Sequence, residues 1–83
     1  MNEDIYSVLD MYDRLIVESG GTLGDEHIQG CVSVINASVG GSESARAEVL
    51  KYITDKIRFC NKNKQWEYQK AEVEFLREVK RRI

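Results

Sequence analysis

The chain has 83 residues, of which 42% are hydrophobic and 31% are charged, and its formal net charge is −2. This length suits one domain rather than two, and this composition excludes an intrinsically disordered chain. No stretch approaches the roughly 20 apolar residues of a membrane-spanning helix, and residues 1–20 lack the pattern of a secretory signal. We therefore expect a single cytoplasmic domain over residues 1–83, with no membrane insertion.

The first segment, residues 3–18, has the apolar spacing of an amphipathic helix. Its apolar residues are Ile5, Val8, Leu9, Tyr12, Leu15 and Ile16. Positions i, i+3, i+4 and i+7 share one face of a helix with 3.6 residues per turn. Gly20 and Gly21 then supply a stop, because glycine readily adopts the left-handed conformation that ends helices.

Residues 22–39 allow two interpretations, a helix or a strand. The apolar residues at helical spacing are Ile28, Cys31, Val32, Ile35 and Val39. The run 31–35 is also rich in β-branched residues, and Gly30 weakens a helix by about 1 kcal/mol relative to alanine. A single strand would lack a partner, because no other segment has a strand pattern. We predict a helix over 23–39, capped by Thr22 and ended by Gly40 and Gly41, with Ser42 as the cap of the next helix.

The second half, from Ser42 to Ile83, contains neither glycine nor proline. Two apolar stripes at helical spacing are separated by the polar residues 61–64, where Asn63 can cap a last helix. The pattern allows a hairpin of helices over 43–60 and 64–82, or one helix of about 40 residues that spans ~60 Å. The hairpin buries more surface within one chain. The fold class we expect is all-α, a bundle of three to four helices with a C-terminal helical hairpin.

Charge is divided unevenly between the two halves of the chain. Residues 1–41 contain seven acids and one base, whereas residues 42–83 contain seven acids and eleven bases, so the halves carry −6 and +4. Such a chain can pair its own halves, attract a second copy or attract a charged partner. Because so short a domain buries only roughly 60% of its unfolded surface, we also predict a homo-oligomer.

His27, Cys31 and Cys60 are the residues that a metal site or a nucleophilic site would use. Zinc ligands usually occur in short paired spacings such as Cys-x-x-Cys, which this chain lacks. A Cys/His nucleophile needs an oriented base and an oxyanion pocket, for which a small helical domain has little room. We expect two reduced, buried thiols, no metal, no cofactor and no enzymatic activity.

The carboxylates that lie at helical neighbour spacing suggest no acid/base chemistry either. Asp10 and Asp13 form one such pair, and Glu74 and Glu78 form another among several bases. Interleaved charges of both signs are typical of a solvated helix face. The sequence therefore predicts no perturbed pair of carboxyl groups.

The basic second half also contains aromatic residues, a combination that can bind nucleic acid through phosphate contacts and base stacking. The pI of about 5.4 and the seven acids of the same half contrast with the clean basic surface of nucleic-acid-binding domains. Binding to another protein is the favoured interpretation. Because Trp, Tyr and Arg dominate protein–protein hot spots, the candidate partner-binding residues are Trp66, Tyr68, Arg77 and Arg81.

The acidic start Asn-Glu-Asp-Ile-Tyr at 2–6 and the charged tail Glu-Val-Glu-Phe-Leu-Arg-Glu-Val-Lys-Arg-Arg-Ile at 72–83, in so small a chain, resemble the accessory proteins of T-even-like phages. Within that group the chain looks most like the cytoplasmic lysis-inhibition accessory proteins. The resemblance implies an antiholin, in the host cytosol, that binds the cytoplasmic segment of a membrane protein, the holin, and delays lysis. The expected function is non-enzymatic regulation through a helical surface. The alternative is a small nucleic-acid-binding or anti-defence protein that uses the basic aromatic half.

Overall fold

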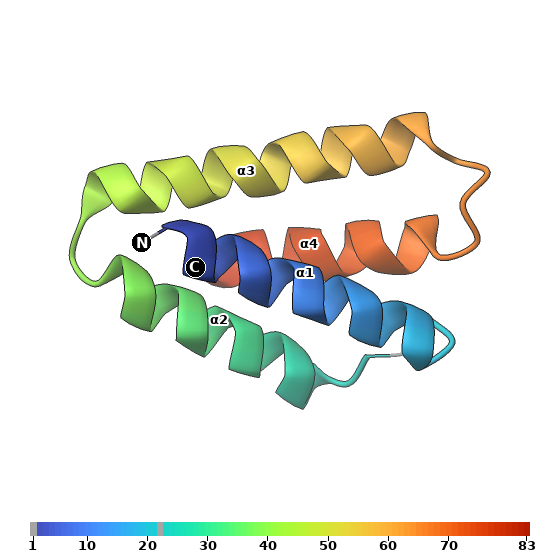
Figure 1. The fold of residues 1–83 in the computed structure, drawn as a ribbon, viewed down its shortest axis with the longest axis horizontal. Helices are drawn as coiled ribbons and strands as arrows, with labels where there is room; N and C mark the ends of the chain where they lie inside the picture. The colour runs from blue at the N-terminus through green and yellow to red at the C-terminus, as the bar shows by residue number, and fades with distance from the viewer. Residues whose placement is uncertain (1, 22) are drawn as a thin grey trace.

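A computed structural model describes the backbone of residues 2–21 and 23–83 and the side chains of residues 5–21 and 23–83. It contains four helices in the order α1 (Asn2–Glu18), α2 (Asp25–Val39), α3 (Glu43–Lys62) and α4 (Gln69–Arg82), and the described residues form no strand. The helices lie side by side with the two ends of the chain at the same end of the bundle (Figure 1). The predicted all-α fold is confirmed.

The glycines end the first two helices as predicted. Gly20, Gly21 and Gly40 have positive φ angles of 71°, 91° and 59°, which side chains with a Cβ rarely adopt. The segment 25–39 is helical rather than extended, but it begins later than predicted. Its N-cap is Gly24, which provides no side-chain hydrogen bond, and Thr22 lies outside the described residues.

Gly30 has a packing role inside α2. A Cβ built at this position would lie 2.9 Å from the hydroxyl oxygen of Tyr12 on α1. A Cβ this close would push the hydroxyl away, so the glycine lets the end of the Tyr12 side chain lie against the α2 backbone. This close approach is the packing role of Gly30.

The second half forms the predicted hairpin, with two corrections at its turn (Figure 1). Ser42 caps α3 by accepting a hydrogen bond from the Ala45 amide at 3.2 Å. Helix α3 extends to Lys62, and Asn63 ends it instead of starting the next helix, because the Asn63 side-chain amide donates to the Phe59 carbonyl at 2.7 Å. The last helix therefore begins at Gln69 and not at residue 64.

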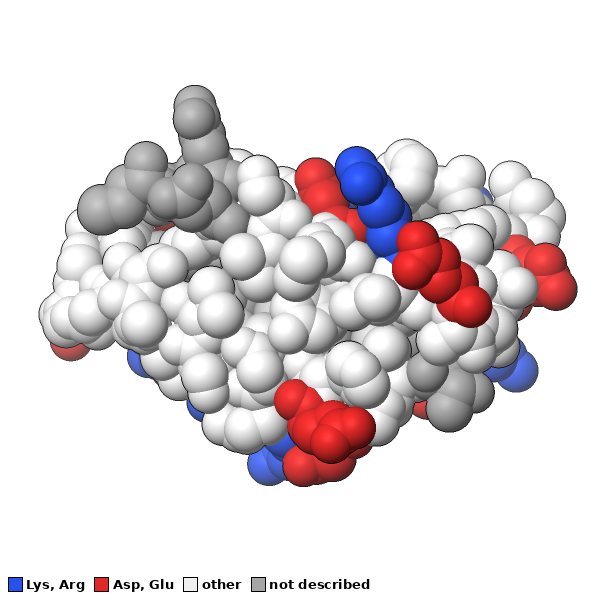
Figure 2. All heavy atoms as spheres, turned by 60° about the horizontal axis from the view of Figure 1, so that its bottom comes forward, with Lys and Arg blue, Asp and Glu red and all other residues white. Residues whose placement is uncertain are grey.

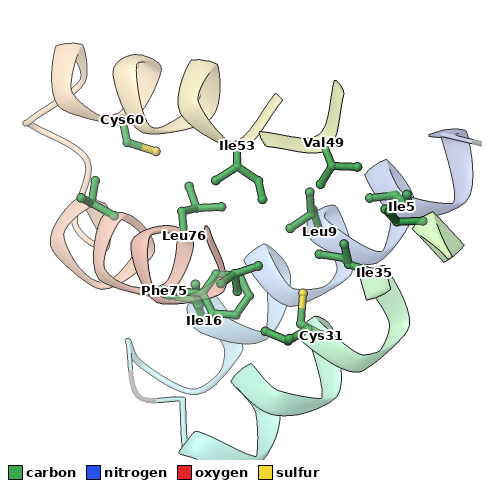
Figure 3. Packing of buried hydrophobic residues seen from close by; sticks show 14 of the residues in the cluster. Ile5, Leu9, Ile16, Cys31, Ile35, Val49, Ile53, Cys60, Phe75 and Leu76 are labelled. Carbon is green, nitrogen blue, oxygen red and sulfur yellow. The ribbon is translucent and has the colours of Figure 1, made fainter. Parts of the chain in front are cut away.

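All four helices contribute to one core (Figure 3). Its largest fully buried side chains point toward each other from each helix, and they include Ile5, Leu9, Ile16, Ile35, Val49, Ile53, Leu76 and Val79. The radius of gyration of 12.2 Å matches the ~12 Å of a folded chain of this length. The predicted stripes thus become the inner surface of a closed bundle.

The two oppositely charged halves pair with each other across the bundle. Lys56 on α3 contacts Asp10 at 2.9 Å and Asp13 at 2.6 Å, both on α1. At the C-terminal end of α4, Arg82 pairs with Asp25 of α2 and with Glu78 of its own helix. Of the three possibilities raised by the uneven charge, the chain therefore shows pairing between its own halves.

Candidate functional site

The most exposed aromatic side chains meet at the turn between α3 and α4. Phe59 is 66% exposed and Trp66 is 37% exposed. Together with Asn63 and Gln65 they line a hollow of about 410 Å³. We call these four residues the aromatic hollow. Exposed aromatic pairs are unusual on a monomer surface and commonly mark binding sites.

Backbone hydrogen bonds hold the turn in place. The amide of Asn63 donates to the Cys60 carbonyl at 3.1 Å, the amide of Trp66 donates to the Asn63 carbonyl at 3.1 Å, and the amide of Gln69 donates to the Trp66 carbonyl at 3.2 Å. The segment thus makes successive tight turns between two packed helices. Trp66 is presented by an ordered connection, which lowers the entropy cost of binding.

The surroundings of the aromatic hollow are basic. Residues 58–70 contain four bases, Arg58, Lys62, Lys64 and Lys70, and one acid, Glu67. Arg58 makes a long contact of 4.0 Å with Asp55, whereas no described carboxylate lies within ion-pair distance of the three lysines. The hollow is therefore an apolar surface with available positive charge around it.

The four predicted partner-binding residues occupy different places. Trp66 lines the aromatic hollow, whereas Tyr68 packs against the core. The Tyr68 ring lies beside Gly21, where an added Cβ would be 3.2 Å from the ring. Arg77 lines a separate hollow of about 210 Å³ further along α4, and Arg81 is paired with Glu78. At 1.5 Å per residue, Arg77 and Arg81 lie roughly 13 to 20 Å from Tyr68 along the helix. The structure does not bring the four together.

Phe59 is one of the aromatic residues of the basic half, but it was not among the four predicted partner-binding residues. Its position in the sequence could have indicated that it is exposed, because Phe59 falls outside the stripe formed by Ile53, Ile57 and Cys60 on the same helix. A large aromatic residue off the buried stripe of a helix has to face solvent or a partner. Only the fold of the turn places it beside Trp66.

A second cluster of ionisable side chains lies largely buried where α1, α3 and α4 meet. The Lys56 ammonium donates to Asp10 and Asp13, and both the Lys56 and Asp13 side chains are less than 20% exposed, at 19% and 18%. Burial alone would lower the pKa of Lys56, but its hydrogen bonds to Asp13 and Asp10 outweigh burial and raise that pKa. The lysine is therefore a permanent cation at this junction.

Glu72 of α4 is the buried acid of this group, at 3% exposure. Burial, and secondly the nearby charge of Asp13, raise its pKa from 4.5 to about 7. Burial also raises the pKa of Asp13, against the opposite effect of Lys56. The prediction that the chain holds no perturbed pair of carboxyl groups is wrong, because Asp13 and Glu72 affect each other's pKa. The two lie on different helices, so no spacing along the chain connects them.

The two cysteines are free and buried, as expected, and they lie on different helices. Burial, with a smaller effect of Asp13 on Cys31 and of Glu72 on Cys60, raises the pKa of each thiol to about 12. Thiols in this state are poor nucleophiles. His27 is exposed, and the described residues contain no group of three or more His, Cys, Asp or Glu that could hold a metal ion.

No helix within the described ranges is both long enough and apolar enough to cross a membrane. Comparisons with models of protein families, with curated proteins and with solved structures find no match to this chain.

Proposed function

We propose that this chain is a non-enzymatic regulatory protein that binds another protein through its helical surface. The observation that carries this proposal is that the exposed side chains of Phe59 and Trp66 line the same hollow. The described residues include five large apolar side chains that are exposed, and the two aromatic ones are these neighbours. Aromatic anchors in a hollow are typical centres of protein interfaces.

The charges around the aromatic hollow indicate the chemistry of the partner. Lys62 and Lys64 alternate along the chain with Asn63 and Gln65, which line the hollow. Neither lysine has a carboxylate partner within the described part of the chain. Complementary charges steer association and select partners. The partner segment is therefore acidic and carries an apolar side chain that fills the hollow. The resemblance to lysis-inhibition accessory proteins makes the cytoplasmic segment of a holin the first partner to assay.

Truncating either aromatic side chain tests the proposal. Phe59→Ala and Trp66→Ala should each weaken binding about tenfold or more, because a hot-spot truncation costs over 1 kcal/mol. Met11→Ala is the matched control, since Met11 is also exposed, at 50%, but lies on α1 in a different hollow. Isothermal titration with the partner segment, and circular dichroism of each variant, would measure the effect. Equal affinities for all three variants would contradict the proposal.

A nucleic-acid partner is the second candidate, favoured by the same aromatic residues with lysines beside them. Base stacking and phosphate contacts would then replace the apolar anchor. Anisotropy of a labelled single-stranded oligonucleotide separates the two candidates. Binding that weakens log-linearly and steeply with salt, and that is lost in Trp66→Ala, would support this candidate over a protein partner.

Self-association is part of the proposal and concerns the outer face of α2. No Asp, Glu, Lys or Arg occurs between residues 27 and 42. Figure 2 brings forward the side of the molecule on which α2 lies, and charged side chains are found mostly near the edges of a broad uncharged area. A second copy can cover such a face without burying unpaired charge.

We expect light scattering at tens of micromolar to give the mass of a dimer. Val34→Glu should shift it to the monomer, because a carboxylate on the α2 face would be buried unpaired in the dimer. Val17→Glu is the matched control, since Val17 on α1 is 43% exposed, as is Val34. A wild-type chain that stays monomeric would remove self-association from the proposal.

A further inference from the structure

Two buried carboxyl oxygens inside the bundle have no hydrogen-bond partner among the described residues. They are Oδ1 of Asp13 on α1 and Oε2 of Glu72 on α4. Each of the two carboxyl groups acts on the pKa of the other, so they are neighbours across α1 and α4. Two ionised carboxylates cannot hydrogen bond to each other, because neither has a proton to donate. One proton placed between them would satisfy both oxygens at once.

The groups around this pair are contributed by all four helices. The titratable residues that act on it or on its neighbours are Asp10 and Asp13 of α1, Cys31 of α2, Tyr52, Lys56 and Cys60 of α3, and Glu72 of α4. Lys56 is the single cation of this set and already serves Asp10 and Asp13. If Glu72 were ionised as well, one ammonium would face three carboxylates in a largely buried junction. An unpaired buried charge of this kind is costly.

We propose that Asp13 and Glu72 share a single proton at neutral pH, and that this buried proton holds α4 against α1. The proton is donated by Glu72 and accepted by Asp13, while the remaining Asp13 oxygen accepts from Lys56 at 2.6 Å. Cys60 of α3 is a further neighbour of Glu72, since each of the two groups affects the pKa of the other. Loss of the proton above neutral pH leaves two facing carboxylates and loosens the packing of α4.

The direction of the pH dependence follows from the Glu72 pKa of about 7 in the folded chain, against 4.5 for an ordinary glutamate. The folded state holds the proton more tightly than the unfolded state. The contribution of Glu72 to the folding equilibrium constant is therefore largest below pH 4.5, falls as the pH rises toward 7 and is level above it. Since each pKa unit corresponds to a tenfold change, the total fall is roughly two orders of magnitude.

Glu72→Gln tests the proposal, because its amide donates a permanent hydrogen bond to Asp13 where the proton would be. Urea denaturation from pH 5 to pH 8 should show the variant and the wild type equally stable at pH 5. At pH 8 the folding equilibrium constant of the variant should exceed that of the wild type by roughly a hundredfold. Glu74→Gln is the matched control on an exposed position of the same helix, and it should keep the wild-type pH dependence. If Glu72→Gln also keeps that dependence, the proposal is wrong.

The wild-type chain provides a second measurement that does not depend on the folding of a variant. Infrared spectra of the native protein should contain a protonated carboxyl band at pH 6 that disappears as the pH passes 7. Exposed carboxyl groups are ionised at pH 6, so the band would report a buried proton. Hydrogen exchange of the α4 amides should accelerate over the same interval by more than that of the α2 amides, because base catalysis accelerates every amide as the pH rises. Absence of the band at pH 6 would overturn the proposal.

Discussion

Replacing Lys56 with methionine is expected to lower the free energy of unfolding by about 2 to 3 kcal/mol at pH 8, below the range for a fully buried ion pair, because the Lys56 and Asp13 side chains are 19% and 18% exposed. The Lys56 ammonium lies 2.6 Å from Asp13, whose side chain is 18% exposed. Methionine fills much of the same volume but leaves the Asp13 carboxylate without a cation. Chemical denaturation followed by circular dichroism would measure the loss.

Lys51→Met is the matched control for this prediction. Lys51 lies on the same helix and is exposed, so its replacement should cost less than about 0.5 kcal/mol. Adding Asp13→Asn to Lys56→Met should recover part of the stability, because the unpaired charge is removed. The cost of Lys56→Met should also shrink at acidic pH, where Asp13 takes up a proton. Equal losses for Lys51→Met and Lys56→Met would contradict the importance of this ion pair.

Leu76→Ala is expected to lower the free energy of unfolding by about 3 to 5 kcal/mol. Leu76 is 0% exposed and lies in the core to which all four helices contribute (Figure 3). The truncation removes buried apolar surface and leaves a cavity that rigid neighbours fill only in part. The shift of the urea midpoint at an unchanged slope would measure the loss.

Leu50→Ala makes the same chemical change at a half-buried position of α3. Its cost should be well below half that of Leu76→Ala, because part of the side chain already contacts water. Similar losses in the free energy of unfolding for the two variants would contradict the full burial of Leu76 in the core.

Part of the aromatic hollow could be predicted from the sequence. Trp66 is recognisable from its residue type and its place beside a polar interruption. Arg77 and Arg81 are recognisable by type as well, but their distance from Trp66 depends on where α4 begins. That start was predicted at residue 64, because asparagine can cap either end of a helix and a sequence does not tell which. With α4 starting at Gln69, the turn is longer, and Phe59 rather than Tyr68 becomes the neighbour of Trp66 in the hollow.

The sequence by itself determined the four helical segments and some of their ends, because these depend on local features. Apolar spacing defined the helical faces, Gly20, Gly21 and Gly40 ended two helices through their positive φ angles, and Ser42 capped a third. Only the tertiary structure decided what surrounds Glu72. Its spacing from Phe75, Leu76 and Val79 places it on the apolar stripe of α4, but its neighbours there depend on where α1 and α3 lie. The carboxyl of Asp13, 59 residues away in the chain, becomes its neighbour only when the bundle closes, and the raised pKa of Glu72 follows from that closure.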